Sequence, residues 1–501
     1  MSTAQEYKEK ENMTIMHPMK RCLRLMIFML ILQFPMAIYA QKPNVIYILA
    51  DQWRSTAFGY VGNEDVKTPA IDQFATESII YRNAITVAPV CTPYRAALMT
   101  GRFPTTTGMF LNDLYLPEEE LCMAEIYESA GYNTAYFGKW HLDGHGRLNN
   151  VEPERRQGFD YWKALECSHE YNNMPYYEND QPDIKYWETY SPFAIARDAG
   201  NYLEAHAKDE KPFLLFISLA TPHFPHNSAP VKYQQMYADK NLTLRKNVPT
   251  AIRENALKEL QGYYAHCTAT DKAIGDILAK LKELDLYSKS IVVFTSDHGE
   301  MMGSHAIEPK QKQVAWDESI RVPFLIRHPA IGQDQGKEVR TPINTPDILP
   351  TLLSLSKIEI PDIVEGEDLS AIVEKPEIQG DRAALFMNVC PFTVMYPEKE
   401  YRGIRTSRYT YVKSPEEAFM LFDNQADPFQ QNNLVGKEEA AALQQELEEQ
   451  LGEKLRSIGD DNFKPRQYYL DKWGYTLGER NTIPYTTEAG AKNNVQTPMR
   501  E

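Results

Sequence analysis

The chain has 501 residues, 43% of them hydrophobic and 24% charged, a composition typical of a globular protein with one large domain and a smaller one. Its formal net charge is −16. Residues 1–40 carry five Lys or Arg and three Glu, a net of +2, so the chain without them would have a net charge of about −18. This balance argues against nonspecific nucleic-acid binding, although a local cationic pocket can still hold an anionic substrate.

Residues 1–40 have the pattern of a secretory signal peptide that is removed from the mature protein. Three basic residues precede an apolar run over 25–38, and Ala40 offers a small residue for cleavage. A membrane helix is the alternative, but this run of fourteen residues is shorter than the ~20 that span a bilayer. We therefore expect a periplasmic or secreted protein without a stable membrane span. Residues 1–18 are polar, which is unusual ahead of a signal peptide, so a later methionine is an alternative start of the protein.

The main part of the chain alternates between short apolar runs rich in β-branched and aromatic residues and stretches with helical periodicity. In chain order we expect a strand over 44–50, a helix from Pro69 capped by Thr68, a helix opening at Cys91, a helix over 118–131, strands over 134–137 and 213–219, a helix over 271–284 and a strand over 290–295. This alternation predicts an α/β fold whose large mixed, mostly parallel sheet is sandwiched by helices.

The C-terminal part of the chain has a different pattern. Residues 381–413 contain strand-like pieces, and 438–456 form an amphipathic helical pattern with four leucines on one stripe. We expect a catalytic domain over 41–355 and a smaller α+β subdomain with a surface tail over 356–501.

Polar residues follow four of the expected strands at the point where each strand ends. They are Asp51, Gln52, Lys139, His141, His223, Asp297 and His298. Because ligands bind at the carboxyl ends of strands in open α/β sheets, we expect one site assembled from these distant segments.

Four of these residues form a candidate metal site. Asp51 and Asp297 supply charged oxygens, Gln52 a carbonyl oxygen and His298 a ring nitrogen. Oxygen-dominated sites favour Ca²⁺ or Mg²⁺, and we expect Ca²⁺. Taken alone, the segment 297–300 is equally well interpreted as a polar loop after a strand. Asp51 follows another strand in the same way, and this equivalent position favours the metal site.

The segment that begins at Cys91 carries the most information about function. Pro93 suits the first turn of a helix, so Cys91 would lie at the positive end of the helix dipole with Arg95 one turn away. Such a place can hold an anion beside a nucleophile. The alternative is a buried structural cysteine. None of the six cysteines (Cys22, Cys91, Cys122, Cys167, Cys267 and Cys390) is spaced like a zinc ligand, and their pairing stays open.

The twelve residues from Cys91 to Arg102 resemble the modification signal of the type I sulfatases of the alkaline phosphatase superfamily, in which this cysteine is oxidised to formylglycine. Further matches are Gly138–His141, His223 and Lys312, which precedes a family-like segment over 316–323. The resemblance runs from about residue 44 to 434.

Two positions have competitors, and two depart from the common family pattern. His226 competes with His223, and Lys310 competes with Lys312, which the spacing favours. Many family members have Asp-Asp in place of Asp51-Gln52 and Asp-Asn in place of Asp297-His298. Both departures resemble a recognised subset of the family, and both lower the negative charge of the site.

The resemblance implies a sulfatase that hydrolyses sulfate esters of carbohydrates, such as glycosaminoglycans or host glycans, after modification by a formylglycine-generating enzyme. The implied metal ligands are Asp51, Gln52, residue 91, Asp297 and His298. Hydrated formylglycine at 91 would attack sulfur while Arg95 and Lys139 neutralise the sulfate oxygens. His223 and Lys312 would protonate the departing sugar oxygen, and His141 would remove the proton of the second hydroxyl to expel sulfate.

Two other functions remain open. One is a phosphonate or phosphate monoester hydrolase of the same superfamily, and the other is a sulfated-glycan-binding protein with an unmodified Cys91. Aromatic and hydrogen-bonding residues over 143–190 suit a sugar ring and a packed loop equally. The sugar, the sulfate position, exo or endo action and the oligomeric state are not predicted.

Overall fold

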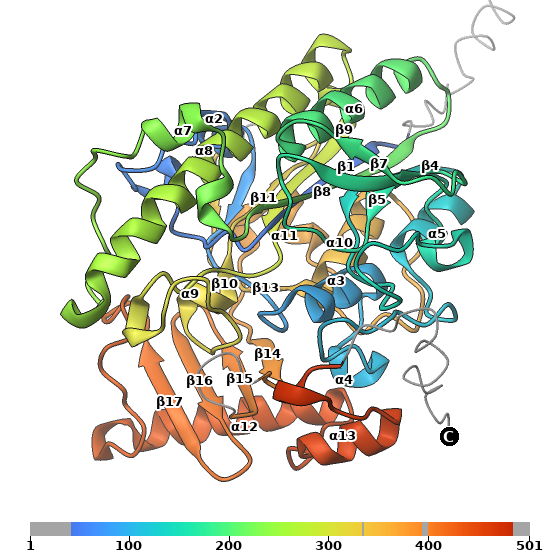
Figure 1. Cartoon of the computed structure of the whole chain (residues 1–501). Coiled ribbons are helices and arrows are strands. Elements are labelled where there is room, and N and C mark those ends of the chain that lie inside the picture. Colours follow the sequence, from blue (N-terminus) through green and yellow to red (C-terminus); the bar gives the residue numbers. More distant parts are fainter. Residues whose placement is uncertain (1–41, 333–334, 393–398, 484–501) are drawn as a thin grey trace, which may run out of the picture. The chain divides into compact units, whose positions relative to one another are not determined.

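The structure of the protein is a computed structural model that describes residues 42–332, 335–392 and 399–483 (Figure 1). The predicted signal peptide and the end of the predicted tail lie outside these residues. In the described part of the chain, no helix is both long and apolar enough to cross a membrane.

A ten-stranded sheet forms the centre of the fold, with the strand order β12-β2-β11-β9-β1-β8-β4-β5-β6-β7. Its middle strands β9, β1, β8, β4 and β5 are parallel, whereas β11, β6 and β7 run antiparallel to a neighbour. The bounds are β1 (Asn44–Asp51), β2 (Ile79–Tyr81), β4 (Asn133–Lys139), β5 (Tyr161–Leu165), β6 (Met174–Glu178), β7 (Lys185–Trp187), β8 (Phe213–Pro222), β9 (Ser290–Ser296), β11 (Phe324–Arg327) and β12 (Glu338–Val339). The predicted mixed, mostly parallel sheet is confirmed.

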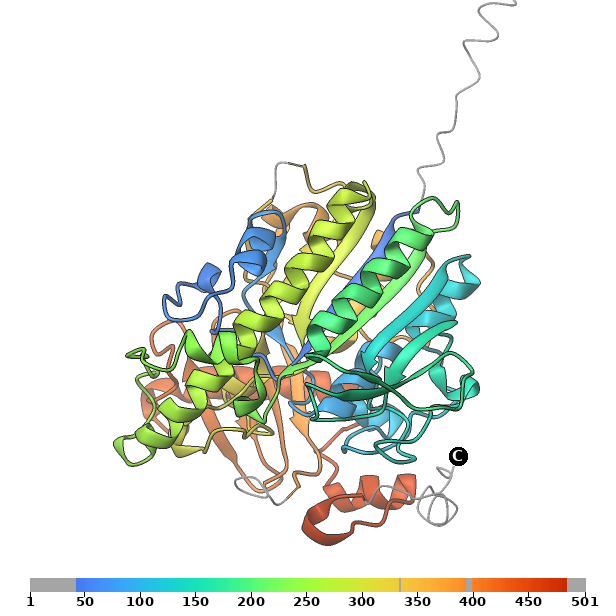
Figure 2. The ribbon, with the colours of Figure 1, turned by 45° about the horizontal axis from the view of Figure 1, so that its top comes forward.

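Helices cover both faces of this sheet, which explains why its central strands are apolar throughout. In β1, Tyr47 and Leu49 pack on one face, while Ile46 and Ile48 pack on the other. The first face is covered by α3 (Cys91–Thr100), α5 (Met123–Ser129) and α10 (Thr345–Leu355). The second is covered by α2 (Pro69–Thr76), α6 (Ser191–His206) and α8 (Arg253–Glu283). Figure 2 shows α6 and α8 side by side, running along the strands that they cover.

A smaller antiparallel sheet follows in the C-terminal part of the chain. Its strands are β14 (Ala384–Asn388), β15 (Tyr401–Arg405), β16 (Tyr409–Lys413) and β17 (Ala418–Asp423), paired in that order. Helix α12 (Ala441–Ser457) packs against β15 and β16 and buries three leucines of the predicted stripe (Leu447, Leu451 and Leu455). The predicted smaller α+β unit is thus present, and its boundary at 356 remains a prediction.

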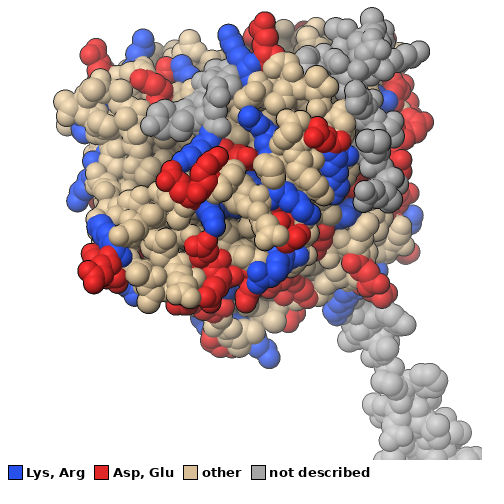
Figure 3. All heavy atoms as spheres, turned by 90° about the horizontal axis from the view of Figure 1, so that it is seen from below, with Lys and Arg blue, Asp and Glu red and all other residues tan. Residues whose placement is uncertain are grey.

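Short elements complete the described fold. A three-stranded sheet contains β3 (Ala84–Ile85), β10 (Arg321–Val322) and β13 (Ile343–Asn344). The remaining helices are α4 (Pro104–Thr107), α7 (Val231–Gln235), α9 (Asp317–Ile320), α11 (Ser370–Glu374) and α13 (Arg466–Trp473). On the face drawn in Figure 3, acidic and basic side chains are interspersed.

Two predicted helices differ in extent from the structure. The helix predicted over 118–131 is shorter, because a capping box in which Glu125 accepts the N–H of Cys122 starts it at Met123. The helix predicted over 271–284 is the second half of the longer α8. The sequence left the pairing of the cysteines open, and all five in the described residues are free thiols.

Thr68 occupies the N-cap position of α2, but its hydroxyl does not cap the helix. Its Oγ1 donates to Asp72 at 3.0 Å. The N–H groups of Ala70 and Ile71 donate instead to the carboxyl of Asp271, at 3.1 and 2.8 Å. The cap of α2 therefore comes from α8, on a distant part of the chain.

Candidate active site

The residues predicted at the strand ends come together at the carboxyl edge of the central sheet. Asp51 ends β1, Lys139 ends β4, His223 follows β8, and Asp297 and His298 follow β9. Each of the ten predicted site residues is at most 4% exposed, so the cluster is shielded from bulk water. Low dielectric surroundings strengthen the electrostatic interactions among these groups.

Four side chains offer a compact set of metal ligands. One ligand atom from each of Asp51, Cys91, Asp297 and His298 can be chosen so that all four lie within 4.8 Å of one another. Two carboxylates and an imidazole suit a divalent cation with oxygen preference.

The tautomer of His298 fits a metal-binding role. Its Nδ1 lies 3.0 Å from the carbonyl oxygen of Gly299, and because a carbonyl only accepts, Nδ1 carries the proton. The lone pair of Nε2 then faces the carboxylates, 3.6 Å from Asp297 Oδ1 and 3.8 Å from Asp51 Oδ1. Burial lowers the pKa of His298 to about 4, with Asp297 opposing and Lys312 reinforcing the shift, so the ring is neutral at pH 7.

Gln52 is held so that its amide oxygen faces the cluster. It adopts a left-handed backbone conformation with φ 63°, and its N–H donates to Asp297 Oδ1 at 3.0 Å. Its side-chain nitrogen donates to Glu300, which leaves Oε1 to accept from Lys312 Nζ at 3.2 Å. Glu300 thus orients Gln52, a role that the sequence analysis did not assign.

Cys91 is the first residue of α3, and the cations near it are Arg95, one turn later in the same helix, and Lys139 at the end of β4. Arg95 donates to Asp51 at 3.2 Å and to Asp297 at 3.4 Å. Lys139 Nζ lies 2.6 Å from Asp51 Oδ2 and 3.6 Å from Cys91 Sγ. The two cations balance the two carboxylates in this buried site.

These charges set the protonation of Asp51 and Cys91. Burial alone would raise the pKa of Asp51, but Lys139, His223 and Arg95 bring it well below its ordinary value, so the carboxyl is ionised. Burial and Asp51 likewise raise the pKa of the Cys91 thiol, whereas Lys139 and Lys312 lower it, and the net shift is downward.

Lys312 and His223 form a pair beside Cys91. Lys312 Nζ lies 3.1 Å from His223 Nε2 and 3.5 Å from Cys91 Sγ. His223 Nδ1 lies 2.8 Å from the carbonyl oxygen of Phe224, so Nδ1 donates and Nε2 accepts from the lysine. Burial, followed by Lys312, lowers the pKa of His223 well below its ordinary value. The proton nearest Cys91 in this pair is therefore on Lys312.

The competing residues His226 and Lys310 lie at a different carboxyl group. His226 Nδ1 is 2.9 Å and Lys310 Nζ is 2.8 Å from the oxygens of Glu259. The His226 hydrogen bond brings the pKa of Glu259 to about 2, with burial opposing and Lys310 reinforcing the shift. The geometry therefore favours His223 and Lys312 as the residues of the cluster.

His141 comes two residues after the end of β4 and has φ 61°, and its Nε2 is 2.9 Å from Asp113 Oδ1. Asp113 is a residue that the sequence analysis missed, since it lies in a loop with no motif of its own. His169, which the sequence placed only in the loop over 143–190, stacks on His223 with ring centroids 4.7 Å apart. Burial, and after it Lys139, lowers the pKa of His169 to about 3.

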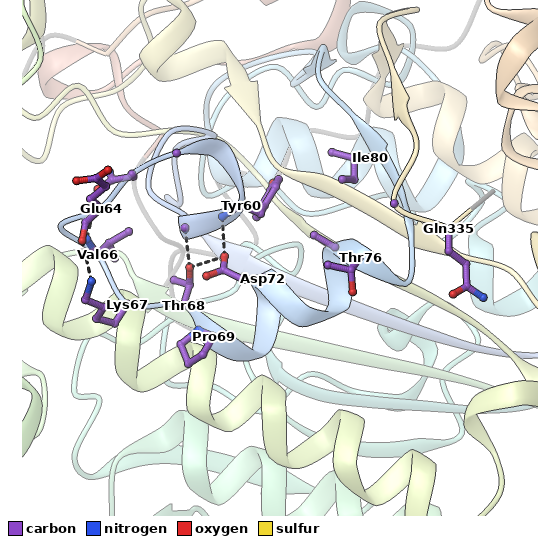
Figure 4. A pocket seen from close by; sticks show the side chains of 15 residues that line it. Tyr60, Glu64, Val66, Lys67, Thr68, Pro69, Asp72, Thr76, Ile80 and Gln335 are labelled. Carbon is purple, nitrogen blue, oxygen red and sulfur yellow. Dashed lines mark hydrogen bonds between the residues drawn. The ribbon is translucent and has the colours of Figure 1, made fainter. Parts of the chain in front are cut away.

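A cavity of about 930 Å³ beside α2 is separate from this cluster (Figure 4). Its polar groups bond to one another, with Thr68 Oγ1 and the N–H of Tyr60 both donating to Asp72. None of the described residues that line it belongs to the predicted site.

Comparisons with known proteins give matches over most of the chain. Residues 43–358 match a family model described as Sulfatase, and residues 308–457 match one described as N-sulphoglucosamine sulphohydrolase, C-terminal. An ulvan-active sulfatase of Formosa agariphila is 59% identical over 91% of this chain and 90% of its own length. An endo-4-O-sulfatase of Bacteroides thetaiotaomicron is 31% identical over 89% of this chain and 96% of its own. A crystal structure titled as the sulfatase YidJ from Bacteroides fragilis superposes with a TM-score of 0.77 at 31% identity and covers 86% of this chain and 98% of its own.

Proposed function

The chain belongs to the sulfatase family, and from this premise we propose that Cys91, after oxidation to formylglycine, is the nucleophile that cleaves sulfate esters of a polymeric carbohydrate. That the protein is an enzyme acting on carbohydrate sulfates follows from the family and its relatives. The proposal that residue 91 is the nucleophile rests on the position of Cys91 at the start of α3. Lys139 Nζ and Lys312 Nζ lie 3.6 and 3.5 Å from its Sγ.

The cations around residue 91 suit the binding of a sulfate group. Arg95, Lys139 and Lys312 converge on this point from α3, from β4 and from the segment before α9. Their fixed charges can stabilise negative charge that builds on the sulfate oxygens in the transition state. Because burial has already stripped water from them, they need little reorganisation during the reaction.

We propose that a divalent cation, Ca²⁺ in preference to Mg²⁺, binds at Asp51, Gln52, Asp297, His298 and residue 91. When bound, it would supply positive charge beside residue 91 and favour ionisation of a hydroxyl there. The neutral His298 and the oriented Oε1 of Gln52 support this ligand set.

Proton transfer is assigned to Lys312, which faces Cys91, to its partner His223 and to His141. We assign Lys312, with His223 as its partner, to protonate the leaving sugar oxygen, because the lysine carries the proton of that pair. His141, held by Asp113, is assigned to take the proton from residue 91 when sulfate is released.

Substrate and location are inferred from relatives and from the N-terminal pattern. The relative at 59% identity is named as ulvan-active, so we propose a sulfated polysaccharide of that kind as substrate. The basic and apolar pattern of residues 1–40 supports export to the periplasm or the medium, and Cys91 requires a formylglycine-generating enzyme.

The test combines a substrate panel with mass spectrometry of the peptide that contains Cys91. Protein coproduced with a formylglycine-generating enzyme is expected to release sulfate from ulvan and from nitrophenyl sulfate, and to lack the thiol at 91. Nitrophenyl phosphate serves as the comparison, since preferred phosphate hydrolysis would favour a phosphohydrolase. Full activity with an intact thiol would refute the proposed nucleophile.

A further inference from the structure

A second cavity, of about 540 Å³, lies between the segment that follows Lys312 and the C-terminal sheet. Trp316 and His305 line it from the catalytic side, together with Asn247. Tyr401 on β15 and Phe419 on β17 line it from the other side. It shares no described residue with the sulfate-binding cluster, so the mechanism above assigns it no role.

Aromatic rings form much of the wall of this cavity. The ring of His305 stacks on Trp316 with centroids 3.6 Å apart and an angle of 11°. Tyr401 and Phe419 face each other at 6.5 Å and 67°. Trp316 and Phe419 are only partly buried. Their flat apolar faces can pack against the C–H faces of a sugar ring while its hydroxyl groups stay free to bond.

Asn247 supplies a buried acceptor with no partner in the described structure. Its Nδ2 donates to Glu318 Oε1 at 2.8 Å and to the carbonyl oxygen of Phe429 at 3.1 Å, which fixes the orientation of the amide. Its Oδ1 accepts no hydrogen bond from the described residues, although Asn247 is only 5% exposed. A buried acceptor without a donor is costly, and because Asn247 lines the cavity, a small movement of its side chain would let a ligand hydroxyl satisfy it.

Lys399 adds a positive charge at the same wall. Its Nζ lies 5.1 Å from the centre of the Phe419 ring and 3.0 Å from Glu417. Both partners of this ion pair are exposed, so the pair is weak and the ammonium can turn to an anionic group of a ligand. Aromatic faces, one unpaired acceptor and one cation together fit an anionic saccharide.

The cavity lies within reach of a substrate that occupies the sulfate site. Lys312 faces Cys91, and Gln313 and Trp316 line the cavity. Four residues of extended chain span at most about 14 Å, which bounds the distance between the Cα atoms of Lys312 and Trp316. We propose that this cavity binds a second sugar unit of the same sulfated polysaccharide whose ester is hydrolysed at residue 91. This inference rests on the proposed function.

The test measures binding of ulvan oligosaccharides by calorimetry in a Cys91→Ala background, so that the ligand is not consumed. Lys399→Ala and Phe419→Ala, each added to that background, are expected to weaken binding about fivefold or more. Lys413→Ala is the matched control, because Lys413 is as exposed as Lys399, pairs with Glu448 and does not line the cavity. With Cys91 intact, the same two variants should raise KM for ulvan and leave nitrophenyl sulfate hydrolysis unchanged.

The outcomes separate this inference from the proposed function. If the Cys91→Ala background binds no ulvan oligosaccharide, or if both cavity variants bind as tightly as Lys413→Ala, the inference is overturned. Equal losses on ulvan and nitrophenyl sulfate would also overturn it, since they would indicate general damage to the fold. A third outcome is that the two cavity variants lose binding selectively while the enzyme with Cys91 intact releases no sulfate from ulvan. This would support saccharide binding in the cavity and refute the proposed substrate.

Discussion

Asp113 Oδ1 lies 2.9 Å from Nε2 of His141, and a short ring of hydrogen bonds ties both residues to the helix that begins at Cys91. Thr92 Oγ1 donates to the carbonyl oxygen of His141 at 3.0 Å and accepts from the N–H of Asp113 at 3.3 Å. Asp113 itself has a left-handed backbone with φ 67°. It is therefore a positioning residue that sets the orientation of the His141 ring relative to residue 91.

We expect Asp113→Asn to lower kcat about tenfold or more with little change in KM, because the amide keeps the shape but loses the charge that orients and stabilises His141. The measurement is steady-state kinetics on a carbohydrate sulfate. Asp180→Asn is the control, since Asp180 is 83% exposed and pairs only with Arg156 in the described contacts. A rise in KM with unchanged kcat would instead assign Asp113 to substrate binding.

Cys91→Ala is expected to abolish turnover on every sulfate ester, because no other described side chain presents a nucleophile at the centre of the cation cluster. Cys122→Ala should keep activity, since Cys122 is a buried thiol at the N-cap of α5, away from the cluster. The measurement is the rate of sulfate release by each variant. Residual activity of Cys91→Ala above background would contradict the assignment.

Removal of metal is expected to inactivate the enzyme, and Asp297→Ala should bind less Ca²⁺ than the wild type. Asp297 contributes one of the two carboxylates in the cluster, so its loss removes a charged ligand and leaves Arg95 with one carboxylate partner. Metal analysis after dialysis measures the effect independently of activity. Asp65→Asn is the control because Asp65 accepts from the N–H of Thr243 outside the cluster. Active wild-type protein without metal would refute the site.

The sequence predicted the sheet edge because each central strand is an apolar run with a polar residue at its end. Asp51, Lys139, His223 and Asp297 could therefore be found by pattern. Asp113, Glu300 and Asn247 could not, because each acts through a contact with a residue far away in the chain. The same reason explains the cap of α2, for which the sequence indicated the adjacent Thr68 and the structure uses Asp271.

His223→Ala is expected to impair hydrolysis of sulfated sugars far more than hydrolysis of nitrophenyl sulfate. A sugar alkoxide needs a proton to leave, whereas nitrophenolate departs without one. Lys312→Ala should reduce both activities, because Lys312 Nζ also lies 3.5 Å from Cys91 Sγ, where sulfate oxygens would bind. The ratio of kcat/KM on the two substrates is the measurement. Equal losses for His223→Ala would assign that residue to sulfate binding.

The stability of the fold should depend on pH through Asp271, which is 2% exposed and caps α2. Burial raises the pKa of Asp271 to about 7, although the N–H groups of Ile71 and Ala70 oppose the shift. The folded state thus holds this proton more tightly than the unfolded state. The contribution is fully present below pH 4 and is lost as pH rises to about 7, by up to about 1.4 kcal/mol per pH unit. Asp271→Asn cannot ionise, so the urea stability of the wild type relative to this variant should fall between pH 5 and 7. A constant or rising difference would show that the backbone N–H groups keep the carboxyl ionised throughout.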